Sequence, residues 1–102
     1  MGARMAVWVY ILECSDGAYY VGSHRGEDPA AREWQHNQGF DPKAWTYRRR
    51  PVRLVWSESF DRADEAVAFE RQIKGWTRAK KEALIRRDWT ALPGLARRRS
   101  RE

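Results

Sequence analysis

A glutamate stands on the apolar side of a predicted helix in the second half of the chain. Four apolar residues at three- and four-residue spacings predict the buried stripe of that helix: Ala63, Ala66, Val67 and Ile73. Glu70 falls on the same stripe. Because burying an unpaired carboxylate is costly, Glu70 needs a partner. The alternatives are an internal ion pair, with Lys74 or Arg32, and a bound cation.

Other residues that could take part in a reaction lie earlier in the chain. Arg32 and His36 are four residues apart in a second predicted helix and therefore project from one face. Tyr10 and Tyr20 lie on two predicted strands of one hairpin. Taken singly, these are a solvated arginine, an edge histidine and packing tyrosines. Their combination with Glu70 in one basic chain favours a functional site.

The elements that must position these residues follow from turn and capping signals. We expect a hairpin over 6–22, a helix over 29–37 that Asp28 caps, an exposed loop over 38–51, a strand over 52–58, a helix from the cap Asp61 to Lys74, and a helix over 78–87 that Thr77 caps. The order β-β-α-β-α-α predicts an α+β domain, with helices packed on a three-stranded, mainly antiparallel sheet.

Length and charge restrict the classes of function. The 102 residues suffice for one domain, which we place at 1–90, followed by a basic tail at 91–102. Residues 1–70 hold nine basic and eleven acidic side chains (9 − 11 = −2), and residues 71–102 hold eleven and three (11 − 3 = +8). This asymmetry indicates a polyanionic partner, either nucleic acid or an acidic membrane surface.

The single cysteine, Cys14, excludes an internal disulfide and indicates a reducing, cytoplasmic setting. The longest apolar stretch, Met5 to Leu12, is too short to span a membrane.

Several short motifs resemble those of the GIY-YIG nucleases. Trp8-Val9-Tyr10 is similar to the first motif but lacks its glycine, and Tyr20-Val21-Gly22 is similar to the second. Gln35-His36-Asn37 and the segment from Glu70 to Lys81 resemble the small stand-alone bacterial members, which are similar to the N-terminal domain of the bacterial excinuclease. The resemblance covers roughly residues 6–85, and the order and spacing of the motifs make it specific.

The resemblance implies a role for each candidate residue. Tyr20 would deprotonate the attacking water, with Tyr10 as its neighbour. Arg32 would steady the phosphate, and Glu70 would bind one divalent cation, Mg²⁺ or Mn²⁺. His36 matches a position near the site. Mg²⁺ takes only one or two carboxylates and keeps several waters, so one glutamate suffices.

One segment departs from the family pattern. The stretch from Gly22 to Arg32 is longer than usual, which affects how Arg32 is aimed. It also makes His24 and Arg25 candidates for extra contacts.

The leading hypothesis is therefore a metal-dependent endonuclease that hydrolyses phosphodiester bonds in DNA or structured nucleic acid. One alternative is a non-catalytic nucleic-acid-binding module with the same fold. Another is a protein-interaction domain that uses exposed tryptophans among Trp34, Trp45, Trp76 and Trp89. Seven residues are predicted to contact nucleic acid: Lys74, Arg78, Lys80, Lys81, Arg48, Arg49 and Arg50. Since 102 residues leave no room for a separate recognition domain, we expect weak cutting, a preference for branched or damaged structures by shape, or dependence on a protein partner that supplies specificity.

Overall fold

The chain folds in the order predicted from its sequence. The computed structural model describes residues 6–26, 28–88, 90 and 92. The helices and strands are β1 (Val7–Glu13), β2 (Tyr19–Arg25), α1 (Ala30–Gln38), β3 (Arg53–Phe60), α2 (Ala63–Lys74) and α3 (Arg78–Ile85), and a 3-10 turn, η1 (Tyr47–Arg49), lies in the loop before β3. The predicted α+β class and the order β-β-α-β-α-α are confirmed.

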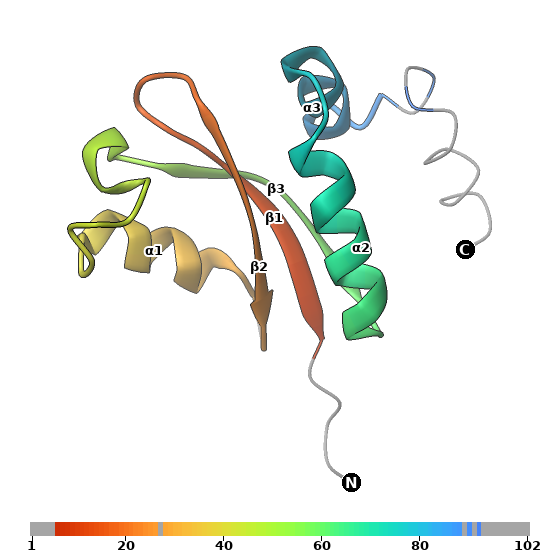
Figure 1. Cartoon of the computed structure of the whole chain (residues 1–102), viewed down its shortest axis with the longest axis horizontal. Helices are drawn as coiled ribbons and strands as arrows, with labels where there is room; N and C mark the ends of the chain where they lie inside the picture. The colour runs from red at the N-terminus through yellow and green to blue at the C-terminus, as the bar shows by residue number, and fades with distance from the viewer. Residues whose placement is uncertain (1–5, 27, 89, 91, 93–102) are drawn as a thin grey trace, which may run out of the picture.

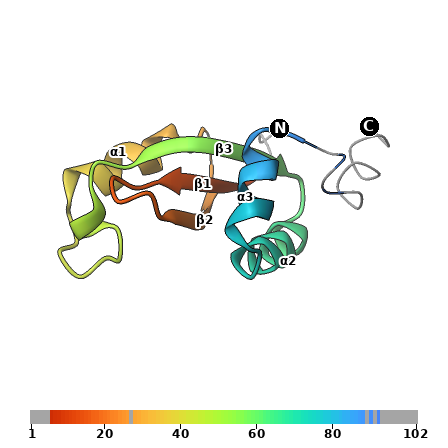
Figure 2. The same ribbon diagram turned by 90° about the horizontal axis from the view of Figure 1, so that it is seen from above.

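The sheet has β1 at its centre. Its strand order is β2-β1-β3, and β1 is antiparallel to both neighbours. Figures 1 and 2 show three layers, with α1 against one face of the sheet and α2 and α3 against the other. Because β1 is covered on both faces, its sequence is apolar without alternation. Within the described part of the chain, no helix is both long and apolar enough to cross a membrane.

The larger hydrophobic core lies between the sheet and the helices α2 and α3. Val9 and Ile11 of β1 belong to one cluster with Phe69 and Ile73 of α2 and Leu84 of α3. All five side chains are buried, and burial of each contributes about 1.5–3 kcal/mol to folding. This core fixes α2 against the sheet.

The buried stripe of α2 differs from the predicted one. Ala66 and Ile73 are buried as expected, and Phe69 completes the stripe. Ala63 and Val67, which were also predicted to be buried, are exposed. The large ring of Phe69 packs against aromatic side chains of β3 and takes the inward position. The helix is thereby rotated relative to the stripe read from small apolar residues.

One of the three predicted helix caps, Thr77, is confirmed. The side chain of Thr77 accepts a hydrogen bond from the first turn of α3 at 3.2 Å. The predicted cap Asp28 is wrong, because Pro29 is the capping residue of α1, although the Asp28 carboxylate accepts a hydrogen bond from the Ala30 N–H at 2.7 Å. The predicted cap Asp61 is wrong, because Arg62 is the capping residue of α2 and no side chain accepts a capping hydrogen bond there. Helix α3 ends at Ile85, before the predicted end.

The segment 38–51, predicted as an exposed loop, is partly helical and partly buried. Gln38 belongs to α1, and Gly39 follows it with a φ of 68°, the left-handed conformation that ends helices. Thr46 in this segment is buried. The predicted tail 91–102, apart from Leu92, lies outside the described residues, as does Trp89. The boundary between domain and tail therefore stays a prediction.

Candidate active site

The two tyrosines lie together on the face of the sheet that α1 covers. Tyr10 pairs with Gly22 across the hairpin, and Tyr20 lies two residues before Gly22 on the same face. The two rings have centroids 6.4 Å apart. A Cβ atom at Gly22 would lie 2.6 Å from the Tyr10 hydroxyl and 3.0 Å from the Tyr20 ring. Glycine at this position is therefore what allows both rings to fit.

Helix α1 brings its arginine and histidine to the tyrosines. Arg32 Nε donates a hydrogen bond to the Tyr10 hydroxyl at 3.4 Å, and Arg32 Nη1 donates to Gln35 at 2.6 Å. The His36 ring lies 5.1 Å from the Tyr20 ring, centroid to centroid. The longer segment before α1 thus leaves Arg32 aimed at the tyrosines. The structure brings four of the five predicted catalytic residues into one cluster.

Two polar side chains, to which the sequence analysis assigned no role, fix α1 to the sheet. Asn37 donates from Nδ2 to the Val52 carbonyl at 2.9 Å, and its Oδ1 accepts from the Val52 N–H at 2.7 Å. Glu33 accepts from the Leu54 N–H at 2.6 Å. Glu33 and Asn37 are four residues apart, as Arg32 and His36 are. That parallel spacing was the available signal for a second functional face on this helix.

The titration states in the cluster follow from burial and from one cation. Burial raises the pKa of Tyr10 above its ordinary value of 10.0, and its hydrogen bond with Arg32 opposes that rise. Burial lowers the pKa values of His36 and His24 below 6.5, and the positive charge of Arg32 lowers both further. At pH 7 Tyr10 is therefore a neutral phenol and both histidines are neutral. Arg32 supplies the positive charge.

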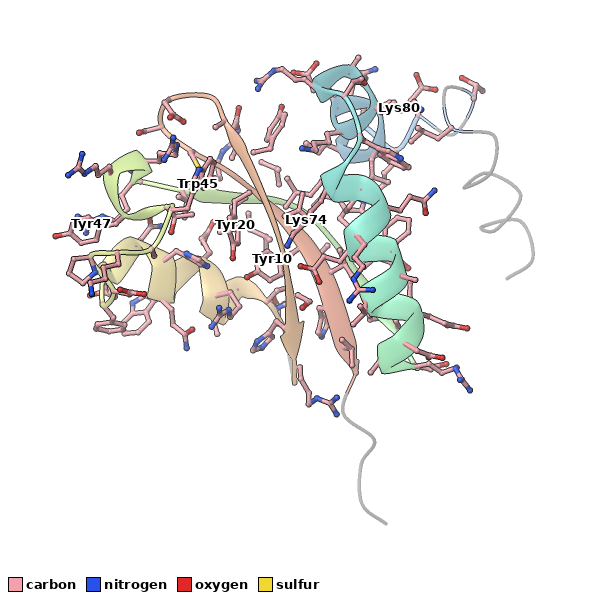
Figure 3. All side chains as sticks on the ribbon, in the orientation of Figure 1. Tyr10, Tyr20, Trp45, Tyr47, Lys74 and Lys80 are labelled. Carbon is pink, nitrogen blue, oxygen red and sulfur yellow. The ribbon has the colours of Figure 1, made fainter. Side chains whose placement is uncertain are left out.

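Glu70 lies on α2, across the sheet from α1, and its carboxylate pairs with Lys74 at 3.0 Å. Its side chain is 15% exposed, so the ion pair is half-buried and satisfies the carboxylate as one of the sequence alternatives expected. The negative charge of Glu70 also raises the pKa of Tyr10, as the smallest of several influences. In Figure 3 the labelled Tyr20, Tyr10 and Lys74 follow one another from the side of α1 towards α2. Glu70 thus acts on the tyrosine cluster only through a minor effect on the pKa of Tyr10.

The donor set can be compared with the needs of a divalent metal ion. In the part of the chain that the structure describes, no group of three or more histidine, cysteine or acidic side chains could hold a metal. A Mg²⁺ ion that keeps most of its waters needs only one or two carboxylates. Glu70, with one oxygen paired to Lys74, fits such a largely hydrated ion and excludes a tightly chelated one.

Part of the loop before β3 covers Tyr20. The Trp45 ring stacks on the Tyr20 ring at 6.0 Å with an interplanar angle of 26°. On Trp45 in turn lies the Arg49 guanidinium, 4.0 Å from the ring centroid. Thr46 Oγ1 lies 2.7 Å from His36 Nδ1. Sequence reasoning had considered Trp45 only as an exposed tryptophan, because nothing local indicates that this loop folds back on the hairpin.

Three of the arginines predicted to contact nucleic acid are engaged within the molecule. Arg49 pairs with Asp16 at 3.1 Å. Arg50 lies over the Tyr47 ring and donates to its carbonyl. Arg78 donates to the Gly17 carbonyl at 2.6 Å, lies over the Tyr19 ring and pairs with Glu82, so that it ties α3 to the hairpin turn.

The remaining predicted contacts are more accessible to a partner. Arg48 and Lys80 are exposed, and Lys81 is half-buried. Lys74 is 56% exposed despite its pairing with Glu70. These four residues are the better candidates for phosphate contacts.

The fold and the cluster define a class of protein. A three-stranded antiparallel sheet presents two hairpin tyrosines to an arginine and a histidine of the following helix, and a glutamate stands on the next helix. This is a nuclease-type arrangement. The model of the GIY-YIG catalytic domain matches residues 6–83, and the chain belongs to this family.

Its relatives are small bacterial proteins. UPF0213 proteins of Staphylococcus aureus strains Mu3 and N315 are 44% identical to it over 79 residues, which are 78% of this chain and 93% of each relative. The solution NMR structure of a UPF0213 protein from Bacillus halodurans is 39% identical, covers 79% of this chain and 83% of that one, and has a TM-score of 0.50. None of these names states an activity.

Proposed function

We propose that the protein is a metal-dependent endonuclease that hydrolyses phosphodiester bonds in DNA or structured nucleic acid. The observation that carries the proposal is the hydrogen bond between Arg32 and Tyr10, beside Tyr20 and His36. This cluster holds a permanent cation next to two phenol groups, in a chain with a net charge of +6. Such a site suits a phosphate diester, whose hydrolysis needs an activated water and compensation of developing negative charge.

Each residue then has a defined task. Arg32 holds the phosphate, because a guanidinium has five N–H donors and its contacts with Tyr10 and Gln35 use two of them. Tyr20, in its phenolate form, takes the proton from the attacking water, while the water oxygen bonds to phosphorus and the P–O bond to the leaving oxygen breaks. Burial keeps Tyr10 neutral. Its hydroxyl orients Arg32 by accepting a hydrogen bond and donates a hydrogen bond to a group bound in the site.

Glu70 is the residue that would hold Mg²⁺ or Mn²⁺. The bound ion would stabilise the negative charge that develops on the phosphoryl oxygens. Lys74, which pairs with Glu70 at 3.0 Å, then turns its ammonium group to a neighbouring phosphate.

A second candidate is a nucleic-acid-binding module without catalysis. The Glu70–Lys74 ion pair favours it, because it accounts for the low exposure of the glutamate without a metal. Both candidates share the basic surface, and both leave room for a protein partner that supplies specificity. The two candidates differ only in whether the Glu70 carboxylate holds a metal ion for catalysis.

A cleavage assay separates the two candidates. Duplex, single-stranded, flap and junction substrates are incubated with Mg²⁺, Mn²⁺ or EDTA. Glu70→Gln should lower cleavage at least about 100-fold while binding persists, in line with the loss of one charge-stabilising group. Glu65→Gln, the same change at an exposed position of the same helix, is the control and should leave cleavage unchanged. Metal-independent binding with no cutting of any substrate would establish the second candidate.

A further inference from the structure

A pocket of about 290 Å³ opens beside the tyrosine cluster, between α1 and the loop that follows it. Six of its lining residues matter for what it can bind: Tyr20, Arg32, Gln35, His36, Phe40 and Tyr47. Its volume lies just below the range of roughly 300–1,000 Å³ for small-molecule sites. It shares Tyr20, Arg32 and His36 with the proposed active site, so a ligand in it lies next to the phosphate.

The pocket walls select a flat ligand with hydrogen-bonding edges. Phe40 and Tyr47 offer aromatic rings, and Gln35 offers a carboxamide with both donors and acceptors. The Nε2 atom of His36 is buried and has no hydrogen-bond partner in the described structure. The carboxylate of Asp41 also lines the pocket and opposes a second phosphate there.

The mouth of the pocket carries exposed aromatic surface. Phe40 is 69% exposed and meets Trp34, itself 57% exposed, edge to face at 5.7 Å. Large aromatic side chains grouped at a surface mark binding sites. In a chain with excess positive charge, rings of this kind serve as platforms on which bases stack.

We propose that this pocket binds one unpaired nucleobase adjacent to the cleaved phosphate, with Phe40 as the exposed stacking ring. The inference rests on the proposed function and narrows its substrate class to nucleic acid with an unpaired nucleotide at the cleavage site. A base inside a duplex is stacked on both sides and cannot enter a pocket without leaving the helix. An unpaired base enters at little cost, which makes it the preferred occupant.

A binding measurement with matched probes tests the pocket without relying on cleavage. Fluorescence anisotropy in EDTA compares a fully paired duplex, the same duplex with one bulged nucleotide, and the same bulge lacking its base. Each probe is made in DNA, with a bulged thymidine, and in RNA, with a bulged uridine. The bulged probe should bind about 5- to 150-fold more tightly than the paired one, the range for one stacked base. The abasic bulge should lose this preference.

Two variants assign the effect to the pocket. Phe40→Leu keeps an apolar side chain but removes the ring, and it should abolish the preference for the bulged probe while binding of the paired duplex persists. Val67→Ala truncates another exposed apolar residue, on α2 across the sheet, and should leave the preference intact. Circular dichroism and thermal melting verify that both variants are folded.

Defined outcomes overturn the inference. Equal binding of all three probes refutes the pocket, and if the wild-type protein still cuts with Mg²⁺, the proposed nuclease stands. A bulge preference without cutting refutes catalysis and leaves the pocket. If the wild-type protein sediments as a dimer, and Phe40→Leu sediments as a monomer with unchanged binding of the probes, the aromatic face binds a second copy of the chain instead of a base. Absence of binding to every probe refutes both.

Discussion

Replacement of Asn37 by alanine should strongly destabilise the protein, although Asn37 is not part of the hydrophobic core. Its side-chain amide forms two hydrogen bonds to the backbone of Val52, which is 4% exposed. Alanine would leave a buried N–H and a buried carbonyl without partners. Each such group costs about 1–3 kcal/mol, and water reaching the adjacent exposed Pro51 offsets part of this. We therefore expect a loss of about 2–4 kcal/mol, a large share of the roughly 5–15 kcal/mol that stabilises a domain.

Urea unfolding measures this loss directly. With a slope of about 1–3 kcal/mol per molar urea, the midpoint should fall by about 0.7–4 M. Gln38→Ala is the matched control, because it removes an exposed amide from the next residue and should change stability by less than about 0.5 kcal/mol. The free energies of unfolding of Asn37→Ala and of this control are then compared. If they agree within about 0.5 kcal/mol, roughly the error of such comparisons, α1 is not held by the Val52 backbone. The reasoning on how Arg32 and His36 are positioned would then fail.

Three other predictions concern the site and its surface. Gly22→Ala would place a methyl group 2.6 Å from the Tyr10 hydroxyl, so thermal melting should show destabilisation by about 1–3 kcal/mol and any cleavage should fall. The lowered pKa of His36 means that its unfolded state binds more protons, so stability should fall as the pH drops below 6.5, and His36→Gln should reduce this pH dependence in urea titrations from pH 7 to 5. Lys80→Ala with Lys81→Ala should flatten the log–log salt dependence of duplex binding by about one to two units, since each phosphate contact contributes about −0.9 to the slope; an unchanged slope would move the binding surface towards the loop before β3.

The sequence alone determined the elements whose signals are local. The apolar run of β1 and the turn at Asp16–Gly17 specified a hairpin, because a strand buried on both faces cannot alternate in polarity. Thr77 predicted the start of α3, because its side chain accepts a hydrogen bond from the first turn of the helix. The four-residue spacing of Arg32 and His36 along one helix placed them on a common face. These features depend on interactions within a few residues, and they were read correctly.

Tertiary structure decided the features that depend on distant partners. Phe69 rather than Val67 faces the core, because aromatic rings of β3 receive it. Arg32, the other partner considered for Glu70, donates to Tyr10 and Gln35 on the opposite side of the sheet, which leaves Glu70 to its neighbour on the same helix, Lys74. Trp45 stacks on Tyr20 from a loop that carries no periodic pattern. In each case the chosen contact depends on how the layers pack together, and such long-range complementarity leaves no signature in the local sequence.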